Sequence, residues 1–457
     1  MRVSKKLHIE NRNILKLLNL FYDNNSEAYI VGGCVRDLIL KENPHDYDIC
    51  TNITPDAVIK LLKSEGIKYT TVGIEYGTIV AIIDNEEFEI TTYRKETGYS
   101  DNRHPDKIAY ANSIEEDLKR RDFTINALAY NVKEQYIVDC FGGIKDIQDK
   151  LIRCVGNPKD RFNEDSLRIL RALRFSIRYG FDIEGNTSNQ MIEQRKLINN
   201  ISKERITSEL KKILSNNKSI SSKFIKYSDI ISEIIPEIAA SINFDQRNRY
   251  HKHTVYEHML AVTDGIDTND WILKLAGLLH DIGKPEAAKL GEDGYFHYIG
   301  HPDIGYEIAS DIANKRLVLT SNETTELLKL IKYHDASIEL TEKSVKRALN
   351  KYGIDFLKKW LLLKQSDIND HLYMEEHANY SENMLSIINE IINKKEPFSL
   401  KDIAVNGNDI MKELGLKPSK QVGITLNKLL DKVINDEIPN DKQCLIDYAR
   451  ETYTDTN

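Results

Sequence analysis

Two aspartates, Asp46 and Asp48, stand one residue apart and follow a glycine pair, Gly32 and Gly33. Paired glycines after a strand let the backbone approach a phosphate, and a helix beginning directly after them would point its amide groups at that anion. Residues two apart on a strand share a face, so both carboxylates would project together. Two such oxygen ligands suit a Mg²⁺ ion that bridges a triphosphate and an attacking hydroxyl. The pattern therefore predicts a magnesium site for nucleotide transfer.

Basic side chains that could hold a triphosphate occur in two places. Arg36 lies in the expected helix after the glycines, where it could pair with a phosphate or with a carboxylate. Arg120 and Arg121 can pair bidentately with triphosphate oxygens, while Asp122 or Asn126 can bond a ribose hydroxyl. An ordinary charged helix start would explain this second block if it stood alone.

A helix is expected over Glu164–Tyr179, and its first turn carries paired charges. Asp165 and Arg168 lie three residues apart, so on one helix they would share a face and present acceptors and donors to the edge of a base. Glu164 could brace Arg168 from four residues away, and Arg171 begins a basic stripe that suits phosphate contact. A solvated salt bridge on a helix surface is the simpler interpretation of the same spacing.

The second half of the chain carries histidines and aspartates in an order that suits a divalent transition metal. The candidate primary ligands are His258, His280, Asp281 and Asp367. His301 and His334 could complete a second metal position or contact a phosphate. Lys284, close behind the His-Asp pair, could offset phosphate charge. A single histidine is more often structural than a ligand, so the prediction rests on the whole set.

Together the first three blocks resemble the signatures of class II tRNA nucleotidyltransferases and bacterial poly(A) polymerases, within the polymerase-β-like superfamily. The stretches Gly73–Ala81 and Phe88–Arg94 fit the next strands of that family. The resemblance implies that residues 120–126 bind the triphosphate and distinguish ribose from deoxyribose. It also implies that the Glu-Asp-x-x-Arg pattern selects CTP and ATP over GTP and UTP. Glu89 is then a candidate third carboxylate, or else an exposed strand residue.

The order His…His-Asp…Asp resembles the HD phosphohydrolase domain, which implies phosphatase or 2′,3′-cyclic phosphodiesterase activity on RNA ends. The tail from Leu400 to Gly423 resembles the C-terminal region of bacterial tRNA nucleotidyltransferases that contain an HD domain. There, Gly415 and Gly423 are expected to flank a short loop whose lysines and amide groups could meet RNA phosphate. A helix-capping loop is an equal alternative.

These motifs require an α+β head followed by helical segments. Strands are expected at Ala28–Val31, Thr78–Ile83 and Phe88–Tyr93, and helices at Ile53–Lys63 and Ile114–Asn131. Lys95–Lys107 is polar and glycine-containing, typical of a mobile loop. We expect four domains: a nucleotidyltransferase head (1–145), a helical neck (146–245), an HD domain (246–372) and a helical tRNA-binding tail (373–457).

Composition limits the partners. The chain has 457 residues, 41% hydrophobic and 29% charged, and a net charge of −8, which disfavours an unselective RNA-coating surface. Its five dispersed cysteines fit a reducing cytoplasm, and the apolar run after Asn13 is too short and too interrupted for a membrane span. We expect a cytoplasmic enzyme that binds tRNA, CTP and ATP, with no membrane and no predicted protein partner.

The resemblance thus implies Mg²⁺-dependent addition of C, C and A to the tRNA 3′ end with release of pyrophosphate. A poly(A) polymerase, or an enzyme adding only A or only the two C residues, would share the same head. From another class, an HD phosphohydrolase with an inactive, RNA-binding head remains an alternative, disfavoured by the intact charged motifs.

Overall fold

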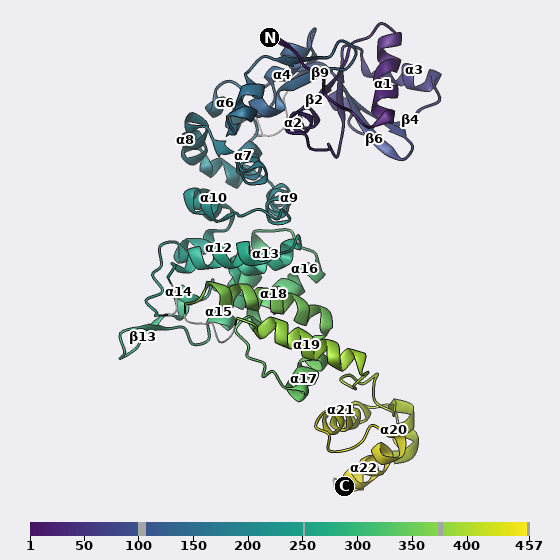
Figure 1. The fold of residues 1–457 in the computed structure, drawn as a ribbon, viewed down its shortest axis with the longest axis vertical. Coiled ribbons are helices and arrows are strands. Elements are labelled where there is room, and N and C mark those ends of the chain that lie inside the picture. Colours follow the sequence, from purple (N-terminus) through teal and green to yellow (C-terminus); the bar gives the residue numbers. More distant parts are fainter. Residues whose placement is uncertain (99–106, 250–251, 373–377, 455–457) are drawn as a thin grey trace. The chain divides into compact units, whose positions relative to one another are not determined.

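The structure is a computed structural model that describes residues 1–98, 107–249, 252–372 and 378–454. Their contacts divide the chain into two units. The first comprises Met1–Pro236 with Arg316–Val318, and the second comprises Glu237–Lys315 with Leu319–Asn457. The first unit contains an eight-stranded sheet followed by helices, whereas the second is almost entirely helical, so the expected α+β class is confirmed (Figure 1).

The head of the first unit is built on the sheet, in the strand order β1-β10-β9-β2-β3-β6-β5-β4. Its strands are β1 (Arg2–Ser4), β2 (Ala28–Val31), β3 (Asp48–Thr51), β4 (Lys68–Thr70), β5 (Thr78–Ile83), β6 (Glu86–Thr92), β9 (Leu128–Asn131) and β10 (Tyr136–Asp139). Helices α1 (Arg12–Asp23), α2 (Gly33–Leu40), α3 (Pro55–Ser64) and α4 (Ile114–Lys119) pack against these strands.

Register in the middle of the sheet brings the glycine turn and the acidic residues to one edge. β2 and β3 are antiparallel, with Val31 opposite Asp48. β3 and β6 are parallel, with Asp48 beside Glu89. Neighbours in register on adjacent strands point to the same face of the sheet, so the Glu89 carboxylate lies on the same side as that of Asp48.

The predicted helix over Ile114–Asn131 is wrong beyond its first turns. α4 ends at Lys119, a 3₁₀ turn, η2, spans Thr124–Asn126, and Leu128–Asn131 form β9. All four residues of β9 are buried, and the strand lies between β2 and β10. A short apolar run has the same hydrophobic pattern whether it is a buried helix or a buried strand, and only its distant partners decide.

The predicted mobile loop Lys95–Lys107 is wrong at its ends. Arg94–Thr97 form β7, which pairs with β8 (Lys107–Tyr110) in a two-stranded sheet. Residues 99–106 of that prediction lie outside the described part of the chain.

The remainder of the first unit is mainly helical and carries the arginine-rich segment. Its elements are α5 (Gly143–Gln148), β11 (Leu151–Ile152), α6 (Pro158–Glu164), α7 (Leu167–Tyr179), β12 (Asp182–Ile183), α8 (Gly185–Glu193), η3 (Arg195–Asn200), α9 (Lys203–Leu214), α10 (Ser221–Lys226) and α11 (Ser228–Ile234). α7 is buried from Leu167 to Phe175 apart from Arg171, and it packs against α9. Its arginines therefore occupy a partly dry environment.

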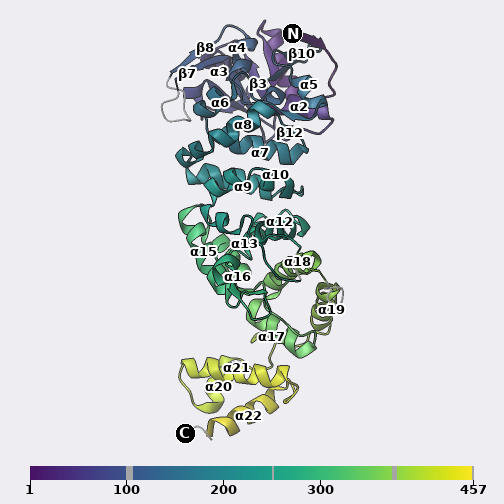
Figure 2. The same cartoon turned by 90° about the vertical axis from the view of Figure 1, so that its left-hand side faces the viewer.

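The second unit is a helical bundle with a smaller group of helices at its end (Figure 2). The bundle contains α12 (Val255–Gly265), α13 (Trp271–Leu279), α14 (Lys284–Ala287), the hairpin β13 (Lys289–Leu290) and β14 (Phe296–His297), α15 (His301–Lys315), α16 (Ser321–Tyr333), α17 (Glu342–Tyr352), α18 (Ile354–Asp370) and α19 (Tyr380–Asn393). The pairs α12·α13, α13·α16, α15·α16 and α12·α18 make its main contacts. α12 begins with a capping box between Thr254 and Glu257, which fixes the start of the helix that carries His258.

The last three helices, α20 (Gly407–Leu414), α21 (Lys420–Ile434) and α22 (Lys442–Thr454), share a core of their own around Ile410, Leu430 and Leu445. The expected loop between Gly415 and Gly423 is shorter than predicted, because α21 begins at Lys420 and includes Gly423. None of the described helices combines the length and the apolar character needed to cross a membrane.

Candidate functional site

The glycine turn after β2 lies against an arginine. Gly32 has φ of +78°, and a Cβ placed there would lie 2.7 Å from Nη1 of Arg121 and 3.9 Å from the Asn126 carbonyl. An L side chain rarely adopts this backbone conformation, so both the turn and the close approach require glycine. α2 begins immediately after it, at Gly33. The turn therefore keeps the backbone and a guanidinium together at the end of β2.

The two aspartates flank a buried tyrosine, but they do not both lie on a strand as expected, because β3 begins at Asp48. Asp46 is exposed, Tyr47 is buried, and Asp48 is the half-buried first residue of β3. Burial raises the pKa of the Asp48 carboxyl to about 6, the charges of Glu89 and Asp46 add to the increase, and Arg121 opposes it. The neighbouring negative charges disfavour the ionised form of Asp48, and a divalent cation beside it would relieve that repulsion.

Asp46 and Asp48 line a cavity of about 330 Å³, whereas Glu89 is not among its lining residues. Its lining contains the predicted Gly32, Gly33, Arg36, Asp46, Asp48, Arg121, Asp122, Asn126 and Arg171, together with Asp37, Arg174, Arg178 and the unpredicted His45. A cavity lined by several arginines and by the carboxylates of Asp46 and Asp48 suits a polyanion carrying a metal ion.

Asp122 is the centre of a buried hydrogen-bond network in this cavity. Its Oδ2 accepts from Nε and Nη2 of Arg171 at 2.9 and 2.6 Å, and its Oδ1 accepts from Nδ2 of Asn126 at 3.0 Å. Burial alone would raise the pKa of the Asp122 carboxyl, but Arg171 and Asn126 outweigh it and hold the pKa at about 2. Asp122 therefore remains ionised and orients both partners.

Arg36 pairs with a carboxylate. Its guanidinium contacts Oδ1 of Asp37 at 2.8 Å and donates to the Asn126 side chain. It also lies over the ring of Tyr179, whose hydroxyl donates to Asp37 at 3.1 Å. Arg36 is only 4% exposed, so it organises the wall of the cavity from within.

Arg120 and Arg121 diverge. Arg121 lines the cavity of the aspartates, whereas Arg120 lines a separate cavity of about 370 Å³ with Glu96 and Glu164. Both donate to the buried Asp117, at 2.9 and 3.3 Å, which the motifs did not identify. The structure therefore does not bring Arg120 into the predicted triphosphate site, and Nε of Arg121 is buried with no hydrogen-bond partner among the described residues.

The expected single helix over Glu164–Tyr179 is wrong, and this changes the predicted base-reading pair. Glu164 ends α6, Asp165 is extended with φ of −142° and ψ of 102°, and α7 begins at Leu167. Asp165 and Arg168 are therefore not one turn apart on one helix face. The brace that the sequence predicted is present, because Nη1 of Arg168 donates to Glu164 at 2.7 Å.

Asp165 has a partner that sequence spacing did not reveal. Nη2 of Arg205, on α9, lies 3.0 Å from both carboxylate oxygens of Asp165. Arg168 is 8% exposed, and its Nη2 donates to the Arg120 carbonyl at 3.1 Å. Nothing in the sequence links residues 165 and 205, which are brought together only by the packing of α7 on α9.

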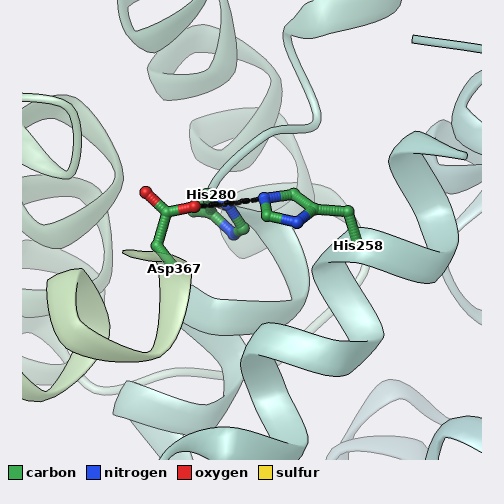
Figure 3. Close-up of side chains that lie close together, drawn as sticks. All are labelled: His258, His280 and Asp367. Carbon is green, nitrogen blue, oxygen red and sulfur yellow. Dashed lines mark hydrogen bonds and ion pairs between the residues drawn. The ribbon is translucent and has the colours of Figure 1, made fainter. Parts of the chain in front are cut away.

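In the second unit, six predicted metal ligands converge in one buried cluster. They form two groups of potential ligands, His258 with His280 and Asp367, and Asp281 with His301 and His334. Figure 3 shows the first group, in which Nε2 of His258 lies 3.1 Å from Oδ1 of Asp367. The donors come from α12, the end of α13, α15, the end of α16, and α18.

Asp281 links the two groups. Its Oδ2 lies 3.3 Å from Nε2 of both His258 and His280, and its Oδ1 lies 3.3 and 3.4 Å from Nε2 of His301 and His334. Burial would raise the pKa of the Asp281 carboxyl, but Lys284 and His280 hold it well below its usual value. The ionised carboxylate therefore faces each group with one oxygen.

The histidines are oriented by hydrogen bonds on their other nitrogens. Nδ1 of His280, His301 and His334 each lies 2.7 to 2.8 Å from a backbone carbonyl, which can only accept. Nδ1 of His258 lies 2.8 Å from the carboxylate of Asp370, a residue that the motif did not identify. Nδ1 thus carries the proton in each ring, and Nε2 is left to face the cluster, as in metal-ligating histidines.

Gly283 and Lys284 support this cluster. A Cβ at Gly283 would lie 2.3 Å from the His301 carbonyl, so glycine is what lets α15 approach. The Lys284 amine is 6% exposed and lies 2.6 Å from Asp281 and 3.0 Å from Gln246. It is fully engaged with these partners in the described chain and orients Asp281.

Comparisons with known proteins bear on both units. Residues 28–153 match the family described as the poly A polymerase head domain, residues 180–242 match a probable RNA- and SrmB-binding site of polymerase A, and residues 317–449 match a putative domain 2 of tRNA nucleotidyltransferases. The last match spans the expected boundary between the HD domain and the tail. The head thus has the family signature of a nucleotidyltransferase.

Several curated relatives are CCA-adding enzymes. The chain is 30% identical to the one from Ligilactobacillus salivarius over 450 residues, covering 96% of each chain. It is 46% identical to the one from Oceanobacillus iheyensis over 211 residues, which is 46% of this chain and about half, 51%, of that relative. Among solved structures, the Bacillus stearothermophilus CCA-adding enzyme in complex with CTP has the same fold, with a TM-score of 0.66 at 22% identity over 97% of both chains.

Proposed function

Because the chain belongs to the family of CCA-adding enzymes, we propose that it adds C, C and A to the 3′ end of tRNA, using CTP and ATP. The terminal 3′ oxygen of the RNA attacks the α-phosphorus, the bond to pyrophosphate breaks, and the hydroxyl proton is lost to solvent or a nearby base. The observation that carries this proposal is the cavity that joins Asp46 and Asp48 to the Gly32 turn and Arg121.

The residues that line the cavity have distinct roles in this reaction. Asp46 and Asp48 would hold Mg²⁺, with Glu89 as a third carboxylate in register beside Asp48. The bound cation would neutralise phosphate charge and favour the attacking alkoxide. Arg121 and the Gly32 turn would hold the triphosphate, while Asn126, fixed by Asp122, lies within the same cavity to meet the ribose. Catalysis would come from positioning and charge stabilisation.

Base selection would require Asp165 and Arg168 to exchange partners. Asp165 now accepts from Arg205, and Arg168 donates to Glu164 and to the main chain. A carboxylate and a guanidinium can match the donors and acceptors on the edges of cytosine and adenine. We propose that they do so in the nucleotide-bound state, with Glu164 continuing to brace Arg168.

One assay distinguishes this proposal from its nearest rivals. The protein is incubated with tRNAs that end before the first C, after one C and after two, with labelled CTP or ATP. Ordered addition of C, C and A is expected. Runs of A on any RNA would indicate a poly(A) polymerase, and arrest after two C residues or addition of A alone would indicate a partial enzyme.

The role of the aspartates is tested in the same assay. Asp46→Ala and Asp48→Ala should each abolish incorporation, because the metal loses a ligand. Asp56→Ala, at an exposed position on α3, is the matched control and should behave like the wild type. Incorporation that survives Asp46→Ala would overturn the assignment.

A second activity is favoured by the histidine cluster. Asp281 faces each of the two groups of ligands with one carboxylate oxygen, which supports a pair of divalent transition-metal ions. One ion would be held by His258, His280 and Asp367, and the other by His301 and His334, with Asp281 shared between them. Imidazole nitrogens with carboxylate oxygens are the donors that such ions prefer. We propose that this centre hydrolyses phosphate esters at RNA 3′ ends, as a phosphatase or a 2′,3′-cyclic phosphodiesterase.

The two activities should separate by mutation. Asp281→Ala should remove the bound metal and the hydrolysis of a 3′-phosphorylated RNA, and should leave CCA addition intact. Asp303→Ala, at an exposed position on α15, is the control. Hydrolysis without incorporation in the wild type would support the alternative of a hydrolase with an inactive head, whereas loss of addition in Asp281→Ala would refute two independent sites.

A further inference from the structure

A cavity of about 280 Å³ adjoins the histidine cluster in the second unit. One wall is formed by residues that follow His334 directly, Asp335 to Ser337, and the other by α18. Asp367, a ligand of the first metal group, also lines the cavity. Figure 3 shows the Asp367 carboxylate extending from α18 toward His258 and His280. A molecule in this cavity would therefore lie beside the metal centre.

Lys364 extends the same helix face away from the metal centre. Residues 364 and 367 are three apart on α18, so their side chains project from one side of the helix, and His371 follows directly after the helix ends at Asp370. Lys364, Asp367 and His371 all line the cavity. Neighbours at this spacing have Cβ atoms about 5–6 Å apart. An ammonium group thus lies one helical turn from a carboxylate that would hold a metal.

The Lys364 ammonium is weakly engaged. Its side chain is 17% exposed, and its ion-pair partner in the described chain is Asp335, at 3.9 Å, whose own side chain is 62% exposed. Lys284, a second lysine beside the cluster, is held at 2.6 Å by Asp281. Of these two cations, Lys364 is the one that an anion can recruit without breaking a short buried ion pair.

We propose that this cavity binds the phosphate of the substrate, with the phosphate between the metal centre and the Lys364 ammonium. Lysine acts toward phosphate as a point charge with several donors, and it does not need the fixed geometry of an arginine. Asp335 holds the ammonium in the absence of substrate and turns toward solvent when the phosphate arrives. The ligand class is a phosphate monoester, or a cyclic phosphodiester, at the end of an RNA or on a nucleotide.

The rest of the cavity fits a single nucleotide end. Its volume lies just below the range of about 300–1,000 Å³ that is usual for small-ligand sites, which leaves room for a phosphate with part of its sugar. Tyr380 forms an aromatic wall, and its hydroxyl donates to the Ile338 carbonyl at 2.7 Å, so the ring is fixed. A fixed ring can pack against a ribose or a base, whereas a duplex would not enter.

The test measures phosphate binding separately from turnover, because the proposal rests on the proposed hydrolase. The full-length protein is loaded with Mn²⁺ or Ni²⁺, its metal content is measured, and the affinity for inorganic phosphate is determined by calorimetry. The variants are Lys364→Ala and Lys364→Arg, with Lys358→Ala as the matched control at an exposed position of the same helix.

We expect Lys364→Ala to weaken phosphate binding by about ten- to a hundredfold, as loss of a charge-assisted contact does, with unchanged metal content. Lys364→Arg should restore most of the affinity, and Lys358→Ala should match the wild type. The KM for a 3′-phosphorylated oligonucleotide should rise in Lys364→Ala more than kcat falls. Equal phosphate affinity in Lys364→Ala and Lys358→Ala would overturn the proposal even if hydrolysis occurs. An absence of hydrolysis with the expected affinities would overturn the hydrolase assignment and leave the phosphate cavity standing.

Discussion

Replacing Gly32 by alanine should have two separate effects, a loss of stability from backbone strain and a loss of nucleotide binding from the displaced Arg121. The position has φ of +78° and ψ of −134°, a region that L residues rarely adopt, and the new Cβ would meet Nη1 of Arg121 at 2.7 Å. The strain should lower the free energy of unfolding by about 1–3 kcal/mol. In a domain of this size, that corresponds to about 2–4 °C in Tm for each kcal/mol.

The displaced guanidinium should also weaken nucleotide binding. A charge-assisted hydrogen bond contributes about 1.5–3 kcal/mol, so losing the Arg121 contact with the triphosphate should raise the KM for CTP and ATP by roughly ten- to a hundredfold, at about 1.4 kcal/mol for each factor of ten. Steady-state incorporation into a tRNA that lacks its CCA end measures this change. A thermal melt of the same preparation measures the strain.

Gly66→Ala is the matched control. Gly66 also has positive φ, +66°, but a Cβ there meets nothing within 4 Å. This variant should show a loss of stability with an unchanged KM. If Gly32→Ala keeps the wild-type KM, or if Gly66→Ala raises it equally, then Arg121 does not contact the triphosphate through this turn.

Three other substitutions test the first unit. Arg174→Ala should lower the free energy of unfolding by about 3–5 kcal/mol, because it leaves the buried Glu209 carboxylate without its cation. Glu209 is 2% exposed and accepts from Arg174 at 2.6 Å. The control is Lys203→Ala, at an exposed position on α9, and a Tm for Arg174→Ala no lower than that of the control would contradict this. Base reading requires Asp165 to leave Arg205, so Arg205→Ala removes a competing partner and should lower the KM for CTP by about tenfold or more, for a contact of about 1.5–3 kcal/mol. An unchanged KM would show that Arg205 does not restrain Asp165. Glu89→Gln removes a charge beside Asp48, so the Mg²⁺ concentration for half-maximal incorporation should increase, and an unchanged Mg²⁺ dependence would make Glu89 an ordinary strand residue.

Much of the metal chemistry could be predicted from the sequence because local rules govern it. Asp46 and Asp48 line one cavity with Tyr47 buried between them, as alternation predicts, although only Asp48 belongs to a strand. The order of the histidines and aspartates was enough to name six residues that converge in the second unit. In both cases the prediction used residue type and short spacing.

The predictions that failed depend on contacts between distant segments. Leu128–Asn131 is a strand because β2 and β10 flank it, which no local pattern contains. The helix expected through Glu164–Arg168 breaks at Asp165, whose carboxylate is held by Arg205, forty residues away. Arg120 and Arg121 are neighbours in sequence but line different cavities, because successive side chains at the end of α4 do not share a face.

The two predicted metal sites differ in how they should hold their ions, and this follows from burial. Asp46 is exposed and the ligands proposed for this site are carboxylates, so Mg²⁺ would keep several waters and arrive largely with the nucleotide. The histidine cluster is buried, with Nε2 atoms already oriented by hydrogen bonds on Nδ1, so its ions would be retained without substrate. Dialysis of the purified protein against a mild chelator should therefore remove Mg²⁺ and leave about two transition-metal ions per chain, one for each group of ligands. His301→Ala should lower that content toward one, because it removes a ligand of the second group only. Retention of no metal by the wild type, or of two by His301→Ala, would refute the paired centre.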